Sequence, residues 1–330
     1  MKKIRGFFAS REFILLAIVI TVFVIFWRQS DIFLTINNLS GLFYNISYLS
    51  IIAVGMTVLF ISGGFDMSTG SHSAFLGIIL GIMLVSGVPV YAAILLIIML
   101  GIMDGIIIGL IVTKLQVNPF VTTLGFLFIF RGAAILVAFT SEYGKGHSGL
   151  SVRNFPDSFL SIGGGNIMGI EYINLYMIAI LIIIFILATR NVFFRQSLYV
   201  GGNAVSARLA GIKINIVTIF NFALVSLMVA IATILKISRI NSASATAGGQ
   251  EVGLSIIAAV IIGGASLRGG SGSVIGSVLG VILISTINNG MVLLGINPFY
   301  SQIFVGGILL GSVLFDELTR RFRVSGLATV

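Results

Sequence analysis

Ten long apolar segments, almost free of charged residues, dominate this sequence and restrict it to a membrane fold. A helix needs about 20 apolar residues to cross the hydrocarbon core of a bilayer. On that rule we expect spans near residues 12–30, 40–62, 68–87, 89–113, 119–140, 172–189, 214–235, 254–266, 273–294 and 299–315. Only 9% of the residues are charged, whereas soluble domains carry about 25%. The sequence therefore predicts an all-α, polytopic membrane protein with about ten transmembrane helices, forming a single domain over residues 1–330. The eighth span is short and rich in glycine, so a broken or re-entrant element is expected there.

The positions of the basic residues predict the orientation of these spans. Ten spans put both termini on the same side, and with cytoplasmic termini thirteen of the nineteen Lys and Arg residues fall inside, as the positive-inside rule requires. The loop 190–213 is then cytoplasmic, and the longer loop 141–171 is periplasmic with some structure of its own. The basic N-terminus before an apolar run fits a signal peptide, but no small-x-small cleavage site follows Trp27, so we expect a retained first span.

The loop RNVFFRQSLYVGGNAVSARLAGIK at residues 190–213 carries four basic residues and no acidic one. Its second half predicts a short helix, with Asn203 as the N-cap, residues 204–210 as the body and Gly211 as the left-handed stop. About two turns of helix are not stable without a contact to pack against. The loop is either an anchor that fixes topology or a docking helix for a cytoplasmic partner.

Composition and motifs argue against an enzyme. There is no cysteine, no Walker A pattern and no nucleophile with a base beside it, and His72 and His147 lie far apart in the sequence with no carboxylate paired to them. The net charge of +9 resides mostly in short clusters beside apolar spans, which is a membrane-orientation pattern and not a sign of nucleic-acid binding. We therefore expect no covalent chemistry and no ATP hydrolysis by this chain.

Polar residues within or beside the spans are the remaining candidates for a pathway. Asp104 falls in the middle of a span, where it is either part of a polar path or a member of an interhelical hydrogen bond. Arg131, also within a span, either pairs with Asp104 or extends outward to the membrane surface. The glycines of SGGFDMSTG at residues 62–70 break a helix, and Asp66 or Ser68 could cap the next one. Pro119 is well placed to begin a helix.

Two rows of glycines four residues apart let helix backbones approach closely in lipid, and we expect them to serve packing within the bundle more than contact between subunits. The rows are Gly101, Gly105 and Gly109, and Gly272, Gly276 and Gly280.

Three segments of the sequence together resemble the inner-membrane permease of ATP-binding-cassette importers, in the ribose / branched-chain amino acid permease superfamily. The block IAAVIIGGASLRGGSGSV at residues 257–274 is similar to the family's IAAVVIGGTSLxGGxGSV, and residues 64–70 and 119–125 are similar to its GxDLSVG and PFIxTLG segments. The likeness covers about residues 55–316 and is closest to the sugar branch (ribose, other monosaccharides, autoinducer-2). The family often has Asn-Gly at Asp104-Gly105, an acidic residue at Gly253, and Gly at Phe194; no role is transferred to Glu251.

The resemblance implies a bacterial inner-membrane permease subunit that moves a small polar solute, a monosaccharide, by alternating access. It implies a second permease copy, identical or related, a cytoplasmic ATPase that binds ATP and Mg²⁺, and an extracytoplasmic solute-binding protein, with membrane lipid around the spans and no cofactor on this chain. The residues that it suggests for ATPase coupling are Arg195, Gly201, Gly202, Asn203, Ala207, Arg208 and Gly211. The residues that we expect along the translocation pathway are Asp66, Ser68, Asp104, Asn118, Phe120 and Thr122. A branched-chain amino acid importer and an ion-coupled secondary transporter using Asp104 remain as alternatives.

Overall fold

The computed structural model describes residues 11–142 and 150–297, together with residues 300, 302, 303, 306, 307, 310, 311 and 314. The described residues are mostly helical. The helices are α2 (Arg11–Gln29), α3 (Ile36–Ile61), α4 (Thr69–Val85), α5 (Val90–Lys114), α6 (Pro119–Thr140), α7 (Asp157–Gly164), α8 (Tyr172–Arg190), α9 (Val192–Gly202), α10 (Ala204–Leu209), α11 (Ile214–Ile240), α12 (Gln250–Ile262) and α13 (Val274–Leu293). Short strands are β1 (Ser151–Arg153), β2 (Asn166–Ile167), β3 (Ile170–Glu171) and β4 (Ser242–Ser244).

Seven of the described helices are long and apolar enough to cross a membrane: α2, α3, α5, α6, α8, α11 and α13. The expected spans at residues 68–87 and 254–266 correspond to the shorter apolar helices α4, with 17 residues, and α12, with 13. The tenth expected span, at residues 299–315, falls largely outside the described residues, as do both termini. A mostly helical membrane fold with a few short strands is thus confirmed, whereas the number of ten spans and the cytoplasmic termini stay predictions.

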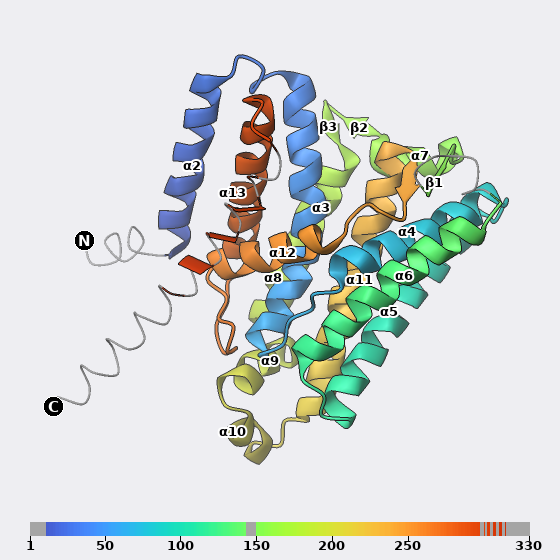
Figure 1. Ribbon diagram of the computed structural model, residues 1–330. Helices are drawn as coiled ribbons and strands as arrows, with labels where there is room; N and C mark the ends of the chain where they lie inside the picture. The colour runs from blue at the N-terminus through green and yellow to red at the C-terminus, as the bar shows by residue number, and fades with distance from the viewer. Residues whose placement is uncertain are drawn as a thin grey trace.

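The helices form two groups around α11 (Figure 1). On one side α2 packs against α13, and α13 against α3; on the other side α4 packs against α5 and α6. Helix α11 lies between the groups and contacts α3, α4 and α5. Helices α9 and α10 lie at one end of the molecule, and α7 with the short strands lies at the opposite end, so these are called the α10 end and the α7 end below (Figure 1).

The predicted glycine rows pack inside the molecule. Gly105 faces α11 so closely that an added Cβ would lie 2.6 Å from the carbonyl oxygen of Phe222, and at Gly109 it would lie 2.8 Å from the Cα of Ile219. Gly101 faces the same helix, Gly280 of the second row faces Ala259 of α12, and Gly276 faces Gly263 directly after α12. Close backbone approach of this kind lets helices associate by packing alone, so both rows stabilise the fold of one chain.

The loop at the α7 end has its own structure, as expected. Strand β1 pairs antiparallel with β4, so the loop that precedes α8 is tied to the segment that follows α11. Helix α11 ends at Asn241, which adopts a left-handed conformation with φ of 51°, and its side chain accepts a hydrogen bond from the backbone N–H of Phe155 at 3.0 Å. Residues 143–149 of this loop lie outside the described residues.

An ion pair links three helices at the same end. Arg239 of α11 donates to the carboxylate of Glu171, just before α8, at 2.7 and 3.1 Å, and Ser40 of α3 donates to it at 2.6 Å. Burial raises the pKa of Glu171, but these hydrogen bonds and the positive charge of Arg239 outweigh burial, and the net pKa is lowered. A lowered pKa means that the ionised carboxylate stabilises the folded protein above the unfolded pKa of about 4.3, and that this stabilisation is lost as the pH falls through the lower folded value.

We expect the Glu171→Gln variant to lose part of this acid sensitivity. Its free energy of unfolding should be lower than that of the wild type at pH 7, by about 1 kcal/mol or less because the pair is partly exposed, and the difference should shrink towards pH 4. Thermal unfolding of the purified protein in detergent at several pH values measures this difference. Glu142→Gln, at an exposed position of the same end, is the matched control. A constant difference across the pH range would contradict the assignment.

Candidate functional site: a polar cavity beside two broken helices

Two irregular segments lead from opposite ends of the molecule to the same place in its interior. Segment 62–68 follows α3 at the α10 end and leads into α4; segment 241–249 follows α11 at the α7 end and leads into α12. Segment 241–249 meets the first turn of α4, directly after segment 62–68: a Cβ added at Gly248 would lie 2.9 Å from the carbonyl oxygen of Gly70. Broken helices with irregular backbone are tolerated at membrane depth where they are buried in protein or line a cavity, and they often mark the substrate site of a transporter.

Arg131 of α6 holds one of these segments in place. Its guanidinium donates hydrogen bonds to the carbonyl oxygens of Ala245 and Thr246, at 3.2 and 3.1 Å. These carbonyl oxygens precede α12 and accept no hydrogen bond from a helix backbone, so the charged guanidinium of Arg131 supplies their hydrogen bonds. Arg131 was expected as a possible partner of Asp104; that expectation is wrong, because the side chain reaches the backbone before α12 instead.

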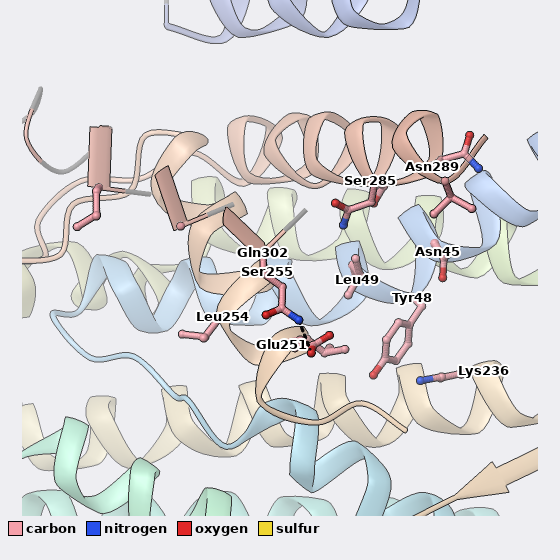
Figure 2. A pocket seen from close by; sticks show the side chains of 15 residues that line it. Asn45, Tyr48, Leu49, Lys236, Glu251, Leu254, Ser255, Ser285, Asn289 and Gln302 are labelled. Carbon is pink, nitrogen blue, oxygen red and sulfur yellow. Dashed lines mark hydrogen bonds between the residues drawn. The ribbon is translucent and has the colours of Figure 1, made fainter. Parts of the chain in front are cut away.

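A cavity of about 700 Å³ opens beside the start of α12, between α3, α11 and α13 (Figure 2). Helices α3, α12 and α13 each line it with one face, because their lining residues recur about one helical turn apart. Its lining comprises Asn45, Tyr48 and Leu49 of α3, Lys236 of α11, Glu251, Val252, Leu254 and Ser255 of α12, Ser285, Asn288, Asn289 and Val292 of α13, and Gln302, Gly306 and Leu310. This volume is typical of sites that take small molecules.

The charged groups of the cavity lie on different walls. Glu251 accepts a hydrogen bond from Gln302 at 2.6 Å. The ammonium of Lys236 lies 4.4 Å from the centre of the Tyr48 ring, in a cation–π contact, and the structure gives it no ion pair with a described residue. The Tyr48 hydroxyl in turn donates to Ser73 at 3.0 Å. One positive and one negative charge leave the cavity with no net charge.

The α13 wall carries polar groups that the protein itself does not satisfy. The amide of Asn289 is paired with that of Asn38 by two hydrogen bonds of 2.7 and 3.1 Å. By contrast, the hydroxyl of Ser285 and the Oδ1 of Asn288 are buried and have no hydrogen-bond partner among the described residues. Buried polar groups are usually paired, so these two are available to water or to a solute.

The predicted pathway residues lie elsewhere, around α4, α5 and α6. Asp66 and Ser68 are fully buried before α4, where the Asp66 carboxylate accepts from the Ser68 backbone N–H and hydroxyl at 2.7 and 2.6 Å. Asn118 accepts from the N–H of Phe120 and so caps α6, whose first residue is the expected Pro119. Phe120 is 44% exposed, whereas Thr122 and Asp104 are buried. None of the six pathway residues lines the cavity, and their role in transport stays a prediction.

Asp104 has a partner that its position in the sequence did not reveal. The Nε2 of His72 in α4 lies 3.0 Å from its Oδ2, and the imidazole stacks on the ring of Phe130 in α6, with centres 4.4 Å apart and planes 12° from parallel. The expectation that His72 has no carboxylate beside it is therefore wrong. Each residue sits on a different helix, so the contact depends on packing and not on spacing in the sequence.

The cavity residues were missed because each is a single polar side chain in an apolar helix. One signal could have found part of them: Ser285, Asn288 and Asn289 lie at positions i, i+3 and i+4 of one expected span, and polar groups sharing one face of a membrane helix face protein or a cavity.

The basic loop at residues 190–213 forms two helices at the α10 end. The Asn203 side chain accepts from the backbone N–H of Ser206 at 3.0 Å, and Gly211 has a left-handed φ of 80°, so the predicted cap and stop of α10 are confirmed. Of the body, Ala207 is buried against the neighbouring helices, whereas Arg208 and Leu209 are exposed. Helix α10 thus presents basic and apolar side chains outward.

The end of α9, within this loop, packs against two other turns through close contacts between glycine backbones. The N–H of Gly270 donates to the carbonyl of Ile61 at the end of α3, at 2.8 Å. Gly201 at the end of α9 lies against both groups, and a Cβ at Gly269 would lie 2.9 Å from its Cα and 2.8 Å from the nitrogen of Gly63. We call this contact the glycine junction: Gly63, Gly201, Gly269 and Gly270 with Ile61. It connects α9 directly to segment 62–68 and to the loop between α12 and α13.

Comparisons of the sequence with known proteins identify the family of this chain. Residues 38–313 match the family described as branched-chain amino acid transport system / permease component. The chain is 36% identical to the ribose import permease protein RbsC of Bacillus subtilis, over 86% of each chain. It is 36% identical to the probable ABC transporter permease protein YphD of Escherichia coli, over 94% of this chain and 92% of the relative.

The L-arabinose transport system permease protein AraH of Escherichia coli is 34% identical, over 88% of this chain and 85% of the relative. No solved structure matches the chain. The family match and these relatives each span most of the chain, and the apolar helices fit a multi-pass inner-membrane protein that acts as a transport subunit and not as an enzyme. The chain therefore belongs to the family described as branched-chain amino acid transport system / permease component.

Proposed function

We propose that this permease imports a neutral monosaccharide, which passes through the cavity between α3, α11, α12 and α13. The observation that carries the proposal is the lining of that cavity, which combines amides, hydroxyls and one charge of each sign without a net charge. Amides and hydroxyls both donate and accept hydrogen bonds, as a polyol requires. Relatives with 36% and 34% identity are named for ribose and L-arabinose, which supports the same class of solute.

Transport would be driven by a separate ATPase that binds ATP and Mg²⁺ and docks at the α10 end. Support for this contact comes from α10, where Val205 is 70% exposed and Leu209 is 84% exposed beside the basic Arg208. A six-residue helix with an apolar outer face needs a partner to be stable. On this proposal the α10 end is cytoplasmic, a second permease subunit completes the transporter, and an extracytoplasmic solute-binding protein delivers the sugar at the α7 end.

The glycine junction would transmit the ATPase movement to the cavity. Arg195, Gly201, Gly202, Asn203, Ala207, Arg208 and Gly211 would then act in coupling by holding α9 and α10 against the core or against the ATPase. Because Gly201 touches the turn after α3 and the loop after α12, a displacement of α9 moves elements that border the cavity. Packed elements with two discrete arrangements carry such coupling.

Charge reversal on α10 tests the docking surface. Arg208→Glu should reduce co-purification of the ATPase and lower ATP-driven uptake by about 5–150-fold, the usual range of a coupling free energy, while the protein still inserts in the membrane. Arg208→Lys keeps the positive charge and is the matched control, with ATPase association near that of the wild type. Unchanged ATPase association in the Glu variant would contradict docking at α10.

Reconstitution tests the function as a whole. The permease, its ATPase and its binding protein are assembled in proteoliposomes, and uptake of D-ribose, L-arabinose and L-leucine is measured with and without ATP. We expect ATP-dependent uptake of a sugar. Uptake of L-leucine alone would support the amino-acid alternative, for which Lys236 and Glu251 offer partners of opposite charge. Uptake without ATP that a protonophore abolishes would favour an ion-coupled transporter.

A further inference from the structure

The cavity offers a specific set of unpaired hydrogen-bonding groups and not merely a polar passage. Ser285 is only 5% exposed and lines the cavity, yet its hydroxyl has no partner among the described residues. One helical turn later, the buried Oδ1 of Asn288 lines the same cavity without a partner there. A buried polar group without a hydrogen-bond partner destabilises the protein, so two such groups side by side indicate that something polar occupies this wall.

The groups around this pair are held in fixed positions. Asn289 is fixed by its amide pairing with Asn38, and Glu251 by its bond from Gln302. Lys236 is held over the ring of Tyr48, whose hydroxyl is itself bonded to Ser73. The walls are therefore preorganised, which lowers the entropic cost of binding a solute. A passage that only conducts needs no such arrangement.

We propose that the permease itself contains a saturable binding site for a neutral, polyhydroxylated solute, with Ser285 and Asn288 as the residues that recognise its hydroxyl groups. The inference rests on the proposed function, since it assigns a substrate site within the proposed pathway. The Ser285 hydroxyl and the Asn288 amide satisfy adjacent hydroxyls, each of which can donate and accept. A neutral solute fits because the cavity carries one cation and one anion. A solute with a net charge would be repelled by whichever of these two groups has the same sign.

Selectivity should therefore be partly a property of this chain and not only of an external binding protein. A site built to hydrogen-bond hydroxyls discriminates strongly against analogues that lack them, because its own polar groups are then left unpaired. Deoxy sugars should bind more weakly than their parent sugars, and sugar acids should bind more weakly than neutral sugars.

Binding to the purified permease in lipid nanodiscs, without ATPase or binding protein, tests the site. The probes are radiolabelled D-ribose, L-arabinose, D-xylose and D-galactose, with D-gluconate and L-leucine for comparison. We expect saturable binding of at least one neutral sugar, and about tenfold weaker affinity in Ser285→Ala and in Asn288→Ala. Ser226→Ala is the matched control, since that buried hydroxyl also has no described partner but does not line the cavity; its affinity should equal that of the wild type.

Several outcomes would overturn the proposal. They are the absence of saturable binding of any neutral sugar, equal affinity in the Ser285, Asn288 and Ser226 variants, and tighter binding of D-gluconate or L-leucine than of the sugars. The thermal unfolding temperature of each variant shows whether a weakened affinity reflects misfolding, and a variant that unfolds early is replaced by Ser285→Cys or Asn288→Ser, which are less disruptive to packing. If ATP-driven sugar uptake by the assembled importer persists while the isolated permease binds nothing, the binding site is wrong and the proposed function stands.

Discussion

Replacing Gly201 by Ala is expected to lower ATP-driven uptake by about 5–150-fold, the usual range of a coupling free energy between sites. The added Cβ would overlap the carbonyl oxygen of Ile61 and lie 2.6 Å from the nitrogen of Gly270. Both atoms belong to the hydrogen bond that ties α3 to the loop after α12, so the methyl group can be accommodated only if α9 moves away from them. Overpacking of this kind costs about 1–3 kcal/mol, too little to unfold the protein but enough to separate the coupling helix from the core.

An exposed glycine outside the proposed coupling residues provides the control. A Cβ at Gly132 of α6 would meet no atom within 4 Å, and neither Gly201 nor Gly132 has a positive φ, so alanine can adopt the backbone conformation at both positions. Gly132→Ala should therefore transport like the wild type. Uptake of D-ribose and L-arabinose into proteoliposomes that contain the ATPase and the binding protein measures the difference, and co-purification reports whether the ATPase still docks. Equal uptake by the two variants would contradict a role of the glycine junction in coupling.

Features that depend on neighbouring residues could be predicted from the sequence. Pro119 at the start of α6, and Asn203 and Gly211 around α10, occupy the predicted positions because helix starts, caps and stops depend on residues within one turn of the helix end. The glycine rows were also interpreted correctly, since small residues four apart on one face have few uses other than close packing. Membrane insertion follows from composition alone.

Features that depend on contacts between distant segments could not be predicted. His72 meets Asp104 across 32 positions, and Arg131 meets carbonyls 114 and 115 positions away, so nothing in the local sequence links them. The cavity was missed for a related reason. A serine in an apolar span, such as Ser277, can equally bond to another helix, as it does to Thr57 at 2.7 Å.

The ends of the shorter spans were also beyond prediction. Hydropathy indicates a run of apolar residues but not where the chain leaves the helix, and α12 begins at Gln250, before the expected residue 254, because segment 241–249 first pairs with β1 and then meets Arg131. Tertiary contacts thus determine the positions of the irregular segments, and these segments in turn shape the cavity.

The second large effect is expected at the buried pair of α4 and α5. His72→Ala removes the partner that the structure gives the Asp104 carboxyl group among the described residues, together with the stacking on Phe130. Removing one member of a buried pair costs about 3–5 kcal/mol, so the variant should unfold at a much lower temperature and accumulate poorly in the membrane. Thermal unfolding of the detergent-purified protein and its yield from membranes measure this loss.

Asp104→Asn separates this structural role from an ionisable one. The amide keeps a side-chain oxygen close to the Nε2 of His72, so the hydrogen bond survives while the charge is removed. If the pair only joins α4 to α5, the Asn variant should fold normally and retain uptake within about threefold of the wild type, a difference below 1 kcal/mol. An ion-coupled transporter, by contrast, needs a group that gains and loses a proton, and the Asn variant of such a protein would fold but not transport. Normal folding with abolished uptake would therefore contradict the structural role and move the centre of the mechanism from the cavity to Asp104.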